Sequence, residues 1–287
     1  MGATPWITVG RVGALWRYPV KSMLGEPLET VDVDDGGLVG DRRFGVVDAE
    51  TGMVASAKRP NRWRALLQLR AAIGTLGAVR VVLPDGRTVL SGGPDTDRVL
   101  SDFLGRPVTL ADKATAGAQL ERAIPETVLE AGVDASAENT MLEIAGAAPP
   151  GTFFDFSPMQ FLTTASLRRA GALHPAGRVE ATRYRPNVIV ETVPELAGFV
   201  ENDWVGRVLH LGSEVTLQVL VPSPRCAIPT LAHGDLGPDP DALRVPLRHN
   251  MVEIPIEGFG SAPCLGAHAT VAQGGRVSAG DEVWLAG

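Results

Sequence analysis

Short β-branched runs separated by turn-forming residues constrain the fold of this chain more than any other feature. In the first third, each run is a few residues long and is followed by Gly, Pro or Asp, as at Asp35-Gly36-Gly37. No long helical repeat lies between the runs, so their spacing is typical of a barrel or a sandwich. Strands are predicted over Ile7–Val12, Leu28–Val33, Phe44–Asp48, Arg64–Arg70 and Val79–Leu83.

Two helices interrupt the predicted strands. A short one over Asp95–Leu104 closes the first unit. The second begins at Pro158, a residue favoured at the first helical position, after the possible caps Asp155 and Ser157, and its apolar stripe runs to Gly171. Strands are predicted again over Val188–Glu191, Arg207–Leu211, Val215–Val221, Val252–Ile256, Ala269–Ala272 and Glu282–Leu285. The predicted fold class is mainly β, with a few helices (α+β).

The domain organisation follows from a change in composition. Residues 111–150 are rich in Ala, Gly, Glu and Pro and show little periodicity, so we predict a linker or variable segment there. It separates an N-terminal domain, residues 1–110, from a C-terminal domain, residues 151–287. A chain of 287 residues is long enough for two domains that bury their cores without disulfides or structural metals.

Charge and cysteine content exclude several classes of protein. The net charge of −7 argues against a general nucleic-acid or anionic-membrane binder. Two cysteines, Cys226 and Cys264, form neither a disulfide framework nor a CxxC pair, which favours a reducing, cytoplasmic location. No apolar stretch is long enough to span a bilayer. Among 26 basic residues, only Lys21, Lys58 and Lys113 are lysines, and the remaining arginines suit bidentate recognition of phosphates and carboxylates.

Two segments near the N-terminus could bind an anion. Lys21 and Ser22 follow a predicted strand where Pro19 stiffens the backbone, and an ammonium and a hydroxyl together can hold a phosphate. A solvated loop lysine is the alternative interpretation, because short motifs are weak evidence. Arg42 and Arg43 begin a strand and are either surface charge or an anion clamp.

Two later segments offer further candidates. Arg185 and Asn187 flank a proline before a strand and could donate hydrogen bonds to a polar heterocycle. The alternative is that Asn187 caps a turn and the arginine lies in water. Arg225 precedes Cys226, and a neighbouring cation favours the thiolate that binds soft metals or attacks electrophiles. An inert, buried cysteine is the alternative. We interpret Cys264, which has no charged neighbour in sequence, as structural.

Other common chemistries lack their sequence motifs. The five histidines show neither HxH nor HExxH spacing, which argues against a histidine-based zinc site. The sequence has no GxSxG elbow, no phosphate-binding GxxxxGK[ST] loop and no convincing GxGxxG after a strand. Serine hydrolases, nucleoside triphosphatases and dinucleotide-binding dehydrogenases are therefore not supported.

Taken in order, these motifs resemble those of the MOSC domain proteins. The N-terminal part of the resemblance is Tyr18-Pro19-Val20-Lys21-Ser22 and Gly40-Asp41-Arg42. The C-terminal part is Asp155-Phe156-Ser157-Pro158, Leu162-Thr163-Thr164-Ala165-Ser166-Leu167, Arg185-Pro186-Asn187, Pro224-Arg225-Cys226 and Gly280-Asp281-Glu282-Val283. Each motif is weak alone, but the ordered set runs from about Val9 to Leu285. The two-domain arrangement is similar to that of the mitochondrial amidoxime-reducing component and its bacterial relatives.

The resemblance implies two linked β-barrel-like domains with a molybdenum cofactor (a molybdopterin) between them. It implies a thiolate ligand of molybdenum at Cys226, which would also be the catalytic residue. Residues implied to bind the cofactor are Lys21, Ser22 and Arg42 for the phosphate, Thr163, Arg185 and Asn187 for phosphate or pterin, and Arg225 beside the ligand. The protein needs to supply only one sulfur, because the cofactor carries its own dithiolene.

The implied activity is reduction of a small N-hydroxylated substrate by a molybdenum oxidoreductase. No flavin, haem or iron–sulfur motif is visible in the sequence, so a reductase carrying one of these groups is the implied electron donor. The alternative is a carrier that binds the cofactor, or holds sulfur on Cys226, without turnover. The loop Ala227–His233 departs from the amidoxime-reducing type and favours this alternative. Asn202 is a further departure, at a position where those relatives have Asp. Lys58 stands where they have arginine, which keeps the positive charge but loses the bidentate hydrogen bonding of a guanidinium.

Overall fold

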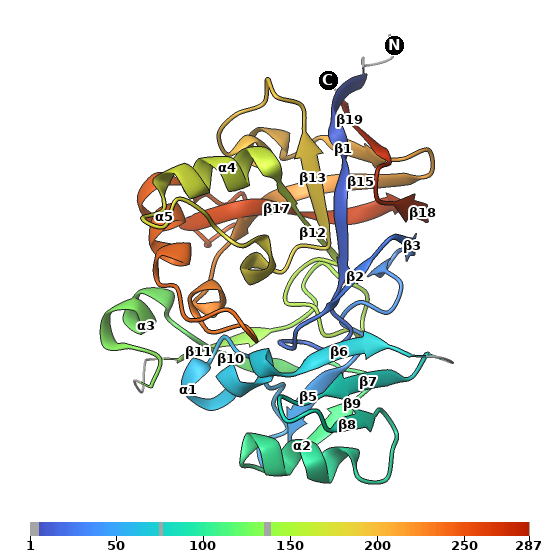
Figure 1. The fold of residues 1–287 in the computed structure, drawn as a ribbon, viewed down its shortest axis with the longest axis vertical. Coiled ribbons are helices and arrows are strands. Elements are labelled where there is room, and N and C mark those ends of the chain that lie inside the picture. Colours follow the sequence, from blue (N-terminus) through green and yellow to red (C-terminus); the bar gives the residue numbers. More distant parts are fainter. Residues whose placement is uncertain (1–5, 75–76, 135–138, 287) are drawn as a thin grey trace.

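The computed structural model describes residues 6–74, 77–134 and 139–286, and it is mainly β, which confirms the predicted fold class. A larger barrel and a smaller β unit lie one above the other, with helices at one side of the barrel (Figure 1). The helices in the described residues are α1 (Pro60–Trp63), α2 (Thr96–Leu104), α3 (Pro125–Ala131), α4 (Thr164–Leu173) and α5 (Asp241–His249). None of them is long and apolar enough to cross a membrane.

Seven strands close the larger barrel. In ring order they are β12 (Met159–Thr163), β13 (Val188–Thr192), β1 (Trp6–Arg17), β19 (Glu282–Ala286), β14 (Val208–Leu211), β15 (Val215–Pro224) and β17 (Ser261–Gln273), which pairs back to β12. Only the β12–β13 pair is parallel. Inward side chains such as Leu209, Leu217, Val283 and Leu285 form one apolar core, as a small barrel requires.

The first strand belongs to this barrel although it begins the chain. β1 pairs antiparallel with β13 and with β19, which brings Trp6 opposite Ala286, so the first and last described residues lie side by side (Figure 1). The residues predicted as an N-terminal domain therefore supply one strand to the C-terminal barrel. Sequence periodicity identifies a strand, but it does not identify the strand's partner.

The smaller unit is built from short strands around a second core. Its sheets are β5 (Gly45–Asp48) with β9 (Val108–Ala111), and β6 (Arg70–Ile73), β7 (Val79–Val82) and β8 (Thr88–Leu90). Met23, Trp63, Leu66 and Leu100 are among the side chains packed inside, and α2 contacts β9. The remaining short strands are β2 (Glu26–Leu28), β3 (Thr30–Asp34), β4 (Gly37–Leu38) and β18 (Gly275–Ser278), of which β2 pairs with β1 and β3 pairs with β4 and β18.

The segment predicted as a linker is structured where the structure describes it. It contains β10 (Gln119–Ala123), α3 and β11 (Asn139–Glu143), and β10 pairs with β11 in an antiparallel ladder. Leu120 is fully buried in a cluster with Phe153 and Ile144. The apolar residues are too few and too widely spaced to give a periodic signal, so the order of this segment comes from packing against its neighbours.

Two of the predicted elements differ in the structure. Residues 159–163, predicted as the start of a helix, form β12, and α4 begins only after Thr163. β12 is buried on both faces, and a continuous apolar run has the same pattern in a buried strand as in a buried helix. Residues 64–68, predicted as a strand, form the 3₁₀ helix η1 (Arg64–Gln68), in which the consecutive residues Leu66 and Leu67 are both buried.

Helix α5 was not predicted from the sequence, and the strand predicted over Val252–Ile256 ends earlier in the structure, at Glu253. Helix α5 carries Pro246 inside it, which disrupts the helical signal. The short strand β16 (Met251–Glu253) pairs with the start of β17, and the loop between them contains Ile256 and Phe259.

The packing of Leu120 provides a test of the order in this segment. Leu120→Ala should lower the free energy of unfolding by about 2–5 kcal/mol, because a fully buried leucine leaves a cavity. Met141→Ala on β11 is the matched control, since its side chain is 47% exposed. Equal, small losses for both variants in urea unfolding would contradict the structured arrangement.

Candidate functional site

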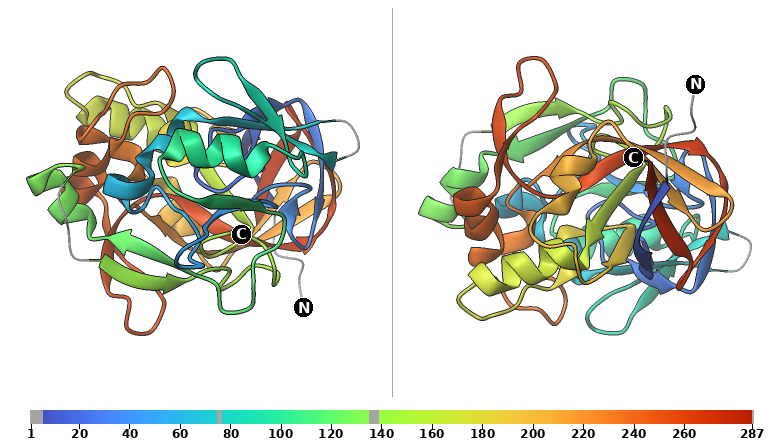
Figure 2. Two further views of the ribbon diagram at one scale, coloured as in Figure 1. Left: turned by 90° about the horizontal axis from the view of Figure 1, so that it is seen from below. Right: turned by 90° about the horizontal axis from the view of Figure 1, so that it is seen from above.

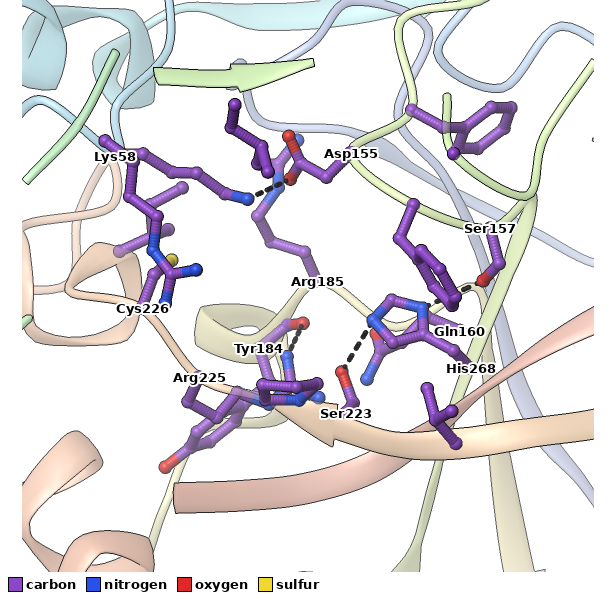
Figure 3. A pocket seen from close by; sticks show the side chains of 18 of the residues that line it. Lys58, Asp155, Ser157, Gln160, Tyr184, Arg185, Ser223, Arg225, Cys226 and His268 are labelled. Carbon is purple, nitrogen blue, oxygen red and sulfur yellow. Dashed lines mark hydrogen bonds and ion pairs between the residues drawn. The ribbon is translucent and has the colours of Figure 1, made fainter. Parts of the chain in front are cut away.

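A cavity of about 380 Å³ lies where loops of the smaller unit face one end of the barrel. Lys21, Arg42 and Lys58 reach it from the smaller unit, whereas Gln160 and His268 reach it from β12 and β17. Figure 3 shows Lys58 and Asp155 toward one end and Ser157 with His268 toward the other. Seven of the eight residues predicted from the sequence line it: Lys21, Ser22, Arg42, Arg185, Asn187, Arg225 and Cys226.

At one end of the cavity, a carboxylate lies between two lysines. Lys21 Nζ donates to Asp155 Oδ1 at 2.5 Å, and Lys58 Nζ lies 3.0 Å from Oδ2 (Figure 3). Lys21 also donates to the carbonyl of Phe153 at 2.9 Å. Burial lowers the pKa of Lys21 to about 8, although Asp155 opposes that shift. Burial alone would raise the pKa of Asp155, but the two ammonium groups outweigh it and hold that pKa well below its usual range.

Two guanidinium groups lie against the Tyr18 ring. Arg42 and Arg185 each place the guanidinium carbon 4.4 Å from the ring centroid. Both residues have positive φ, 44° and 56°, a region that non-glycine residues rarely adopt. Burial, followed by the charge of Arg42, lowers the pKa of Arg185 to about 10. The fold therefore keeps two like charges close together at the cost of strained backbone.

Asp41 and Asn187 fix Arg42 in place. Asp41 Oδ2 accepts from Arg42 Nη1 at 2.5 Å and from Asn187 Nδ2 at 2.8 Å, while Oδ1 accepts from the backbone N–H of Tyr18 at 2.6 Å. Asn187 Oδ1 accepts from the N–H of Gln160 at 3.1 Å. The amide of Asn187 thus joins the Asp41 loop to β12 and orients the site through Asp41.

Ser22 and Thr163, the two predicted hydroxyls, have different surroundings. Ser22 Oγ lines the cavity and accepts from the N–H of Ala57 at 3.0 Å, which leaves its own proton available for donation. Thr163 does not line the cavity. It is the N-cap of α4, where its Oγ accepts from the N–H of Ser166 at 3.1 Å, and its side chain is fully buried. The structure therefore places Thr163 in a helix cap, a position consistent with the change from strand to helix there.

Arg225 is held by main-chain oxygens. Its Nε donates to Leu265 O at 2.8 Å, its Nη1 donates to Tyr184 O at 3.0 Å, and Nη2 also donates to Leu265 O. Burial lowers its pKa to about 10. These bonds hold the chain just before Cys226, a half-buried free thiol at the cavity, whereas Cys264 is buried and its pKa is raised to about 12 by burial.

His268 lies at the other end of the cavity and was not predicted as a site residue. His268 Nδ1 lies 2.9 Å from Ser157 Oγ, and Nε2 lies 3.1 Å from Ser223 Oγ (Figure 3). Ser157 donates its proton to Met159 O at 3.0 Å, so it accepts from Nδ1–H. Burial lowers the pKa of His268 to about 3, so the ring is neutral and Nε2 accepts from Ser223. No motif links these three residues in sequence.

The charge at the Lys21 end of the cavity is unbalanced. Four cations, Lys21, Lys58, Arg42 and Arg185, face two carboxylates, Asp41 and Asp155. Among the residues that the structure describes, Arg185 Nη2 has no hydrogen-bond partner although it is buried. A buried donor without a partner is costly, and an anionic group would compensate it.

Two family profiles match the sequence. Residues 9–107 match the MOSC N-terminal beta barrel domain, and residues 149–284 match the MOSC domain. The chain belongs to the MOSC domain proteins. MOSC domains are associated with binding of the molybdenum cofactor and with sulfurases of that cofactor. No curated protein sequence matches the chain.

Two solved structures are similar to this MOSC protein in part or in whole. The YUAD protein from Bacillus subtilis is 13% identical, with a TM-score of 0.43, and the alignment covers 98% of this chain and 97% of that one. YiiM from Geobacillus stearothermophilus is 17% identical, with a TM-score of 0.30, over 45% of this chain and 54% of that one.

Asp155 provides a pH-dependent test of the lysine pair. Asp155→Asn should lower the free energy of unfolding at pH 7 by roughly 1–3 kcal/mol, less than for a fully buried pair, because Asp155 is 37% exposed. Without Asp155, the folded protein releases the proton of Lys21 at a pH below about 8, whereas the unfolded chain keeps it to about pH 10. In the wild type the same release occurs only near pH 8, so the loss shrinks as the pH rises to about 8 and is constant above it.

Urea unfolding at several pH values measures this loss. Asp35→Asn, at an exposed position, is the matched control and should be neutral throughout. A loss in Asp155→Asn that is the same at pH 6 as at pH 9 would show that the lysines do not cause it.

Proposed function

We propose that this MOSC protein binds a molybdenum cofactor and reduces N-hydroxylated small molecules with electrons from a partner reductase in the cytoplasm. The observation that carries the proposal is the cavity itself, which combines an excess of buried positive charge with a half-buried thiol. The cofactor's phosphate and the soft metal require those two features.

The residues present fit the cofactor. The cation set leaves two positive charges uncompensated, which matches a phosphate dianion, and the unpartnered Nη2 of Arg185 is a donor for it among the described residues. Lys21, Ser22 and Arg42 come from one side and Arg185 from the other, so both parts of the chain would contribute. Cys226 would supply the protein's sulfur ligand.

Each side chain then has a distinct task. Lys21 and Arg42 would bind and orient the phosphate, while Asp155 holds Lys21 in place and Asp41 holds Arg42. Three residues position the site without a place on the phosphate. Asn187 holds Asp41, Arg225 holds the chain before Cys226, and Thr163 caps the start of α4. When bound, the cofactor would supply two-electron redox chemistry at molybdenum. The neutral His268 keeps a proton on Nδ1 and can pass hydrogen bonds between Ser157 and Ser223.

Turnover provides the direct test. Protein produced in cells that make the cofactor should contain molybdenum and a fluorescent pterin after oxidation, and it should reduce benzamidoxime to benzamidine with an artificial electron donor. Protein that retains molybdenum but reduces none of a series of N-hydroxylated compounds would favour the carrier function. Absence of both molybdenum and pterin would contradict both the oxidoreductase and a carrier of the cofactor.

Cys226→Ser tests the ligand role. A hydroxyl is a hard, hardly ionised replacement for a soft thiolate, so molybdenum and activity should be lost, while pterin falls only in part because Lys21, Arg42 and Arg185 remain. The melting temperature should change little, because Cys226 lies at a cavity.

Cys264→Ser is the matched control for this substitution. It buries a poorly paired hydroxyl and should cost roughly 1–3 kcal/mol of stability, but it should keep molybdenum. A Cys226→Ser protein that keeps full molybdenum and activity would end the ligand assignment.

A further inference from the structure

The segment outside both family domains packs directly on the loop after Cys226. The MOSC profiles end at residue 107 and resume at residue 149, so β10, α3 and β11 belong to neither. Ala123 and Val128 of this segment form one buried cluster with Ala227, and Val133 contacts a cluster that includes Ile228 and Cys226. Both views of Figure 2 show α3, in green, beside the orange segment that follows β15.

This packing limits the size of the residues that the loop can hold. Ala227 is 1% exposed, and a larger residue there would have to displace Ala123. Arg183 fixes the same loop further on, because its guanidinium donates to Leu231 O at 3.1 Å and to Gly237 O at 2.9 Å. The loop and the unmatched segment are therefore one packing unit next to the thiol.

The same segment presents an arginine to the cavity. Arg122 of β10 lines the same cavity as Cys226. The residues that follow them in sequence, Ala123 and Ala227, belong to one buried cluster. Its neighbour Glu121 points elsewhere and pairs with Arg59 and Arg62. Within residues 6–74, 77–134 and 139–286, the guanidinium of Arg122 makes no ion pair or side-chain hydrogen bond, and Glu143, which also lines the cavity, does not pair with it.

We propose that Arg122 binds an anionic group of the substrate beside Cys226, so that the preferred substrates are N-hydroxylated compounds that carry a carboxylate or similar acid. The reaction named in this inference rests on the proposed function. The positive charge of Arg122 beside Cys226 does not depend on that function. Apolar side chains also line this cavity: Leu142 on β11 and Ile254, Ile256 and Phe259 of the β16–β17 loop, of which Phe259 is 43% exposed. They would contact the uncharged body of such a molecule.

The anion could instead belong to the cofactor, but the observations favour the substrate. The phosphate-binding set is complete without Arg122, and all of its members lie within the two family domains. A cofactor common to a family is expected to be held by parts that the family shares. Arg122 lies on the part that is particular to this chain, where selectivity between substrates is commonly built.

Alkylation of Cys226 in the full-length chain, produced without the cofactor, tests the electrostatics without any turnover. Iodoacetate and iodoacetamide have nearly the same shape, and each transfers its carbon to the thiolate sulfur with loss of iodide, but only iodoacetate is an anion. The rate constant for iodoacetate divided by that for iodoacetamide does not depend on the thiolate fraction or the accessibility of Cys226, because both reagents share these factors. Arg122→Gln should lower that ratio by about fivefold at low salt, as expected for removing a unit charge near a protein surface.

Matched variants separate charge from folding. Arg122→Lys keeps the charge and should keep most of the ratio, and Arg80→Gln, at an exposed arginine of β7, should keep all of it. Buried Cys264 should stay unreactive in every variant, which reports an intact fold. An unchanged ratio in Arg122→Gln would overturn the proposal, whether or not the protein proves to be an oxidoreductase.

The cofactor-loaded protein distinguishes the two sources of the anion. Arg122→Gln should leave the molybdenum content unchanged and raise the KM for 4-carboxybenzamidoxime about fivefold relative to its effect on neutral benzamidoxime. Loss of molybdenum from this variant would assign Arg122 to the cofactor and overturn the substrate role. An equal effect on both substrates would also overturn it.

Discussion

Positive charge held inside a cavity is the constraint on which the rest of this site depends. Lys21, Lys58, Arg42 and Arg185 cannot be brought together without compensation, because each loses hydration and repels the others. Asp155 compensates the lysines, and Asp41 compensates the arginines together with the face of the Tyr18 ring. The compensation is incomplete, which leaves the cavity electropositive and suited to an anion.

The barrel supplies the rigidity that such an arrangement needs. Parallel β12 and β13 place Gln160 beside the segment that carries Arg185 and Asn187, while β15 and β17 bring Ser223 and His268 to the same cavity. Asn187 and Arg225 are predominantly hydrogen-bonded to the protein itself. Their contribution is to fix loops at the strand ends, so a motif residue can be needed at a site without being a ligand.

The segment between the two family domains adds features of its own to a cavity that those domains otherwise form. It packs on the loop after Cys226 through Ala123, Val128 and Val133, and it carries Arg122 to the cavity. A change in that segment therefore alters both the shape and the charge of the space beside the thiol. The cations of the shared domains are not affected by it directly, because they are held by Asp41 and Asp155.

The sequence alone determined the mainly β fold, many strand positions and eight candidate residues of which seven line the cavity, because period-two patterns and ordered short motifs are local properties. Tertiary structure alone decided the remainder. Residues 159–163 became a strand because they are buried between two other strands, Thr163 became a helix cap, and the described part of residues 111–150 packs around Leu120. Asp155, His268 and Arg122 joined the site through pairings between distant segments, and a side chain's partner across such a distance leaves no periodicity in the sequence.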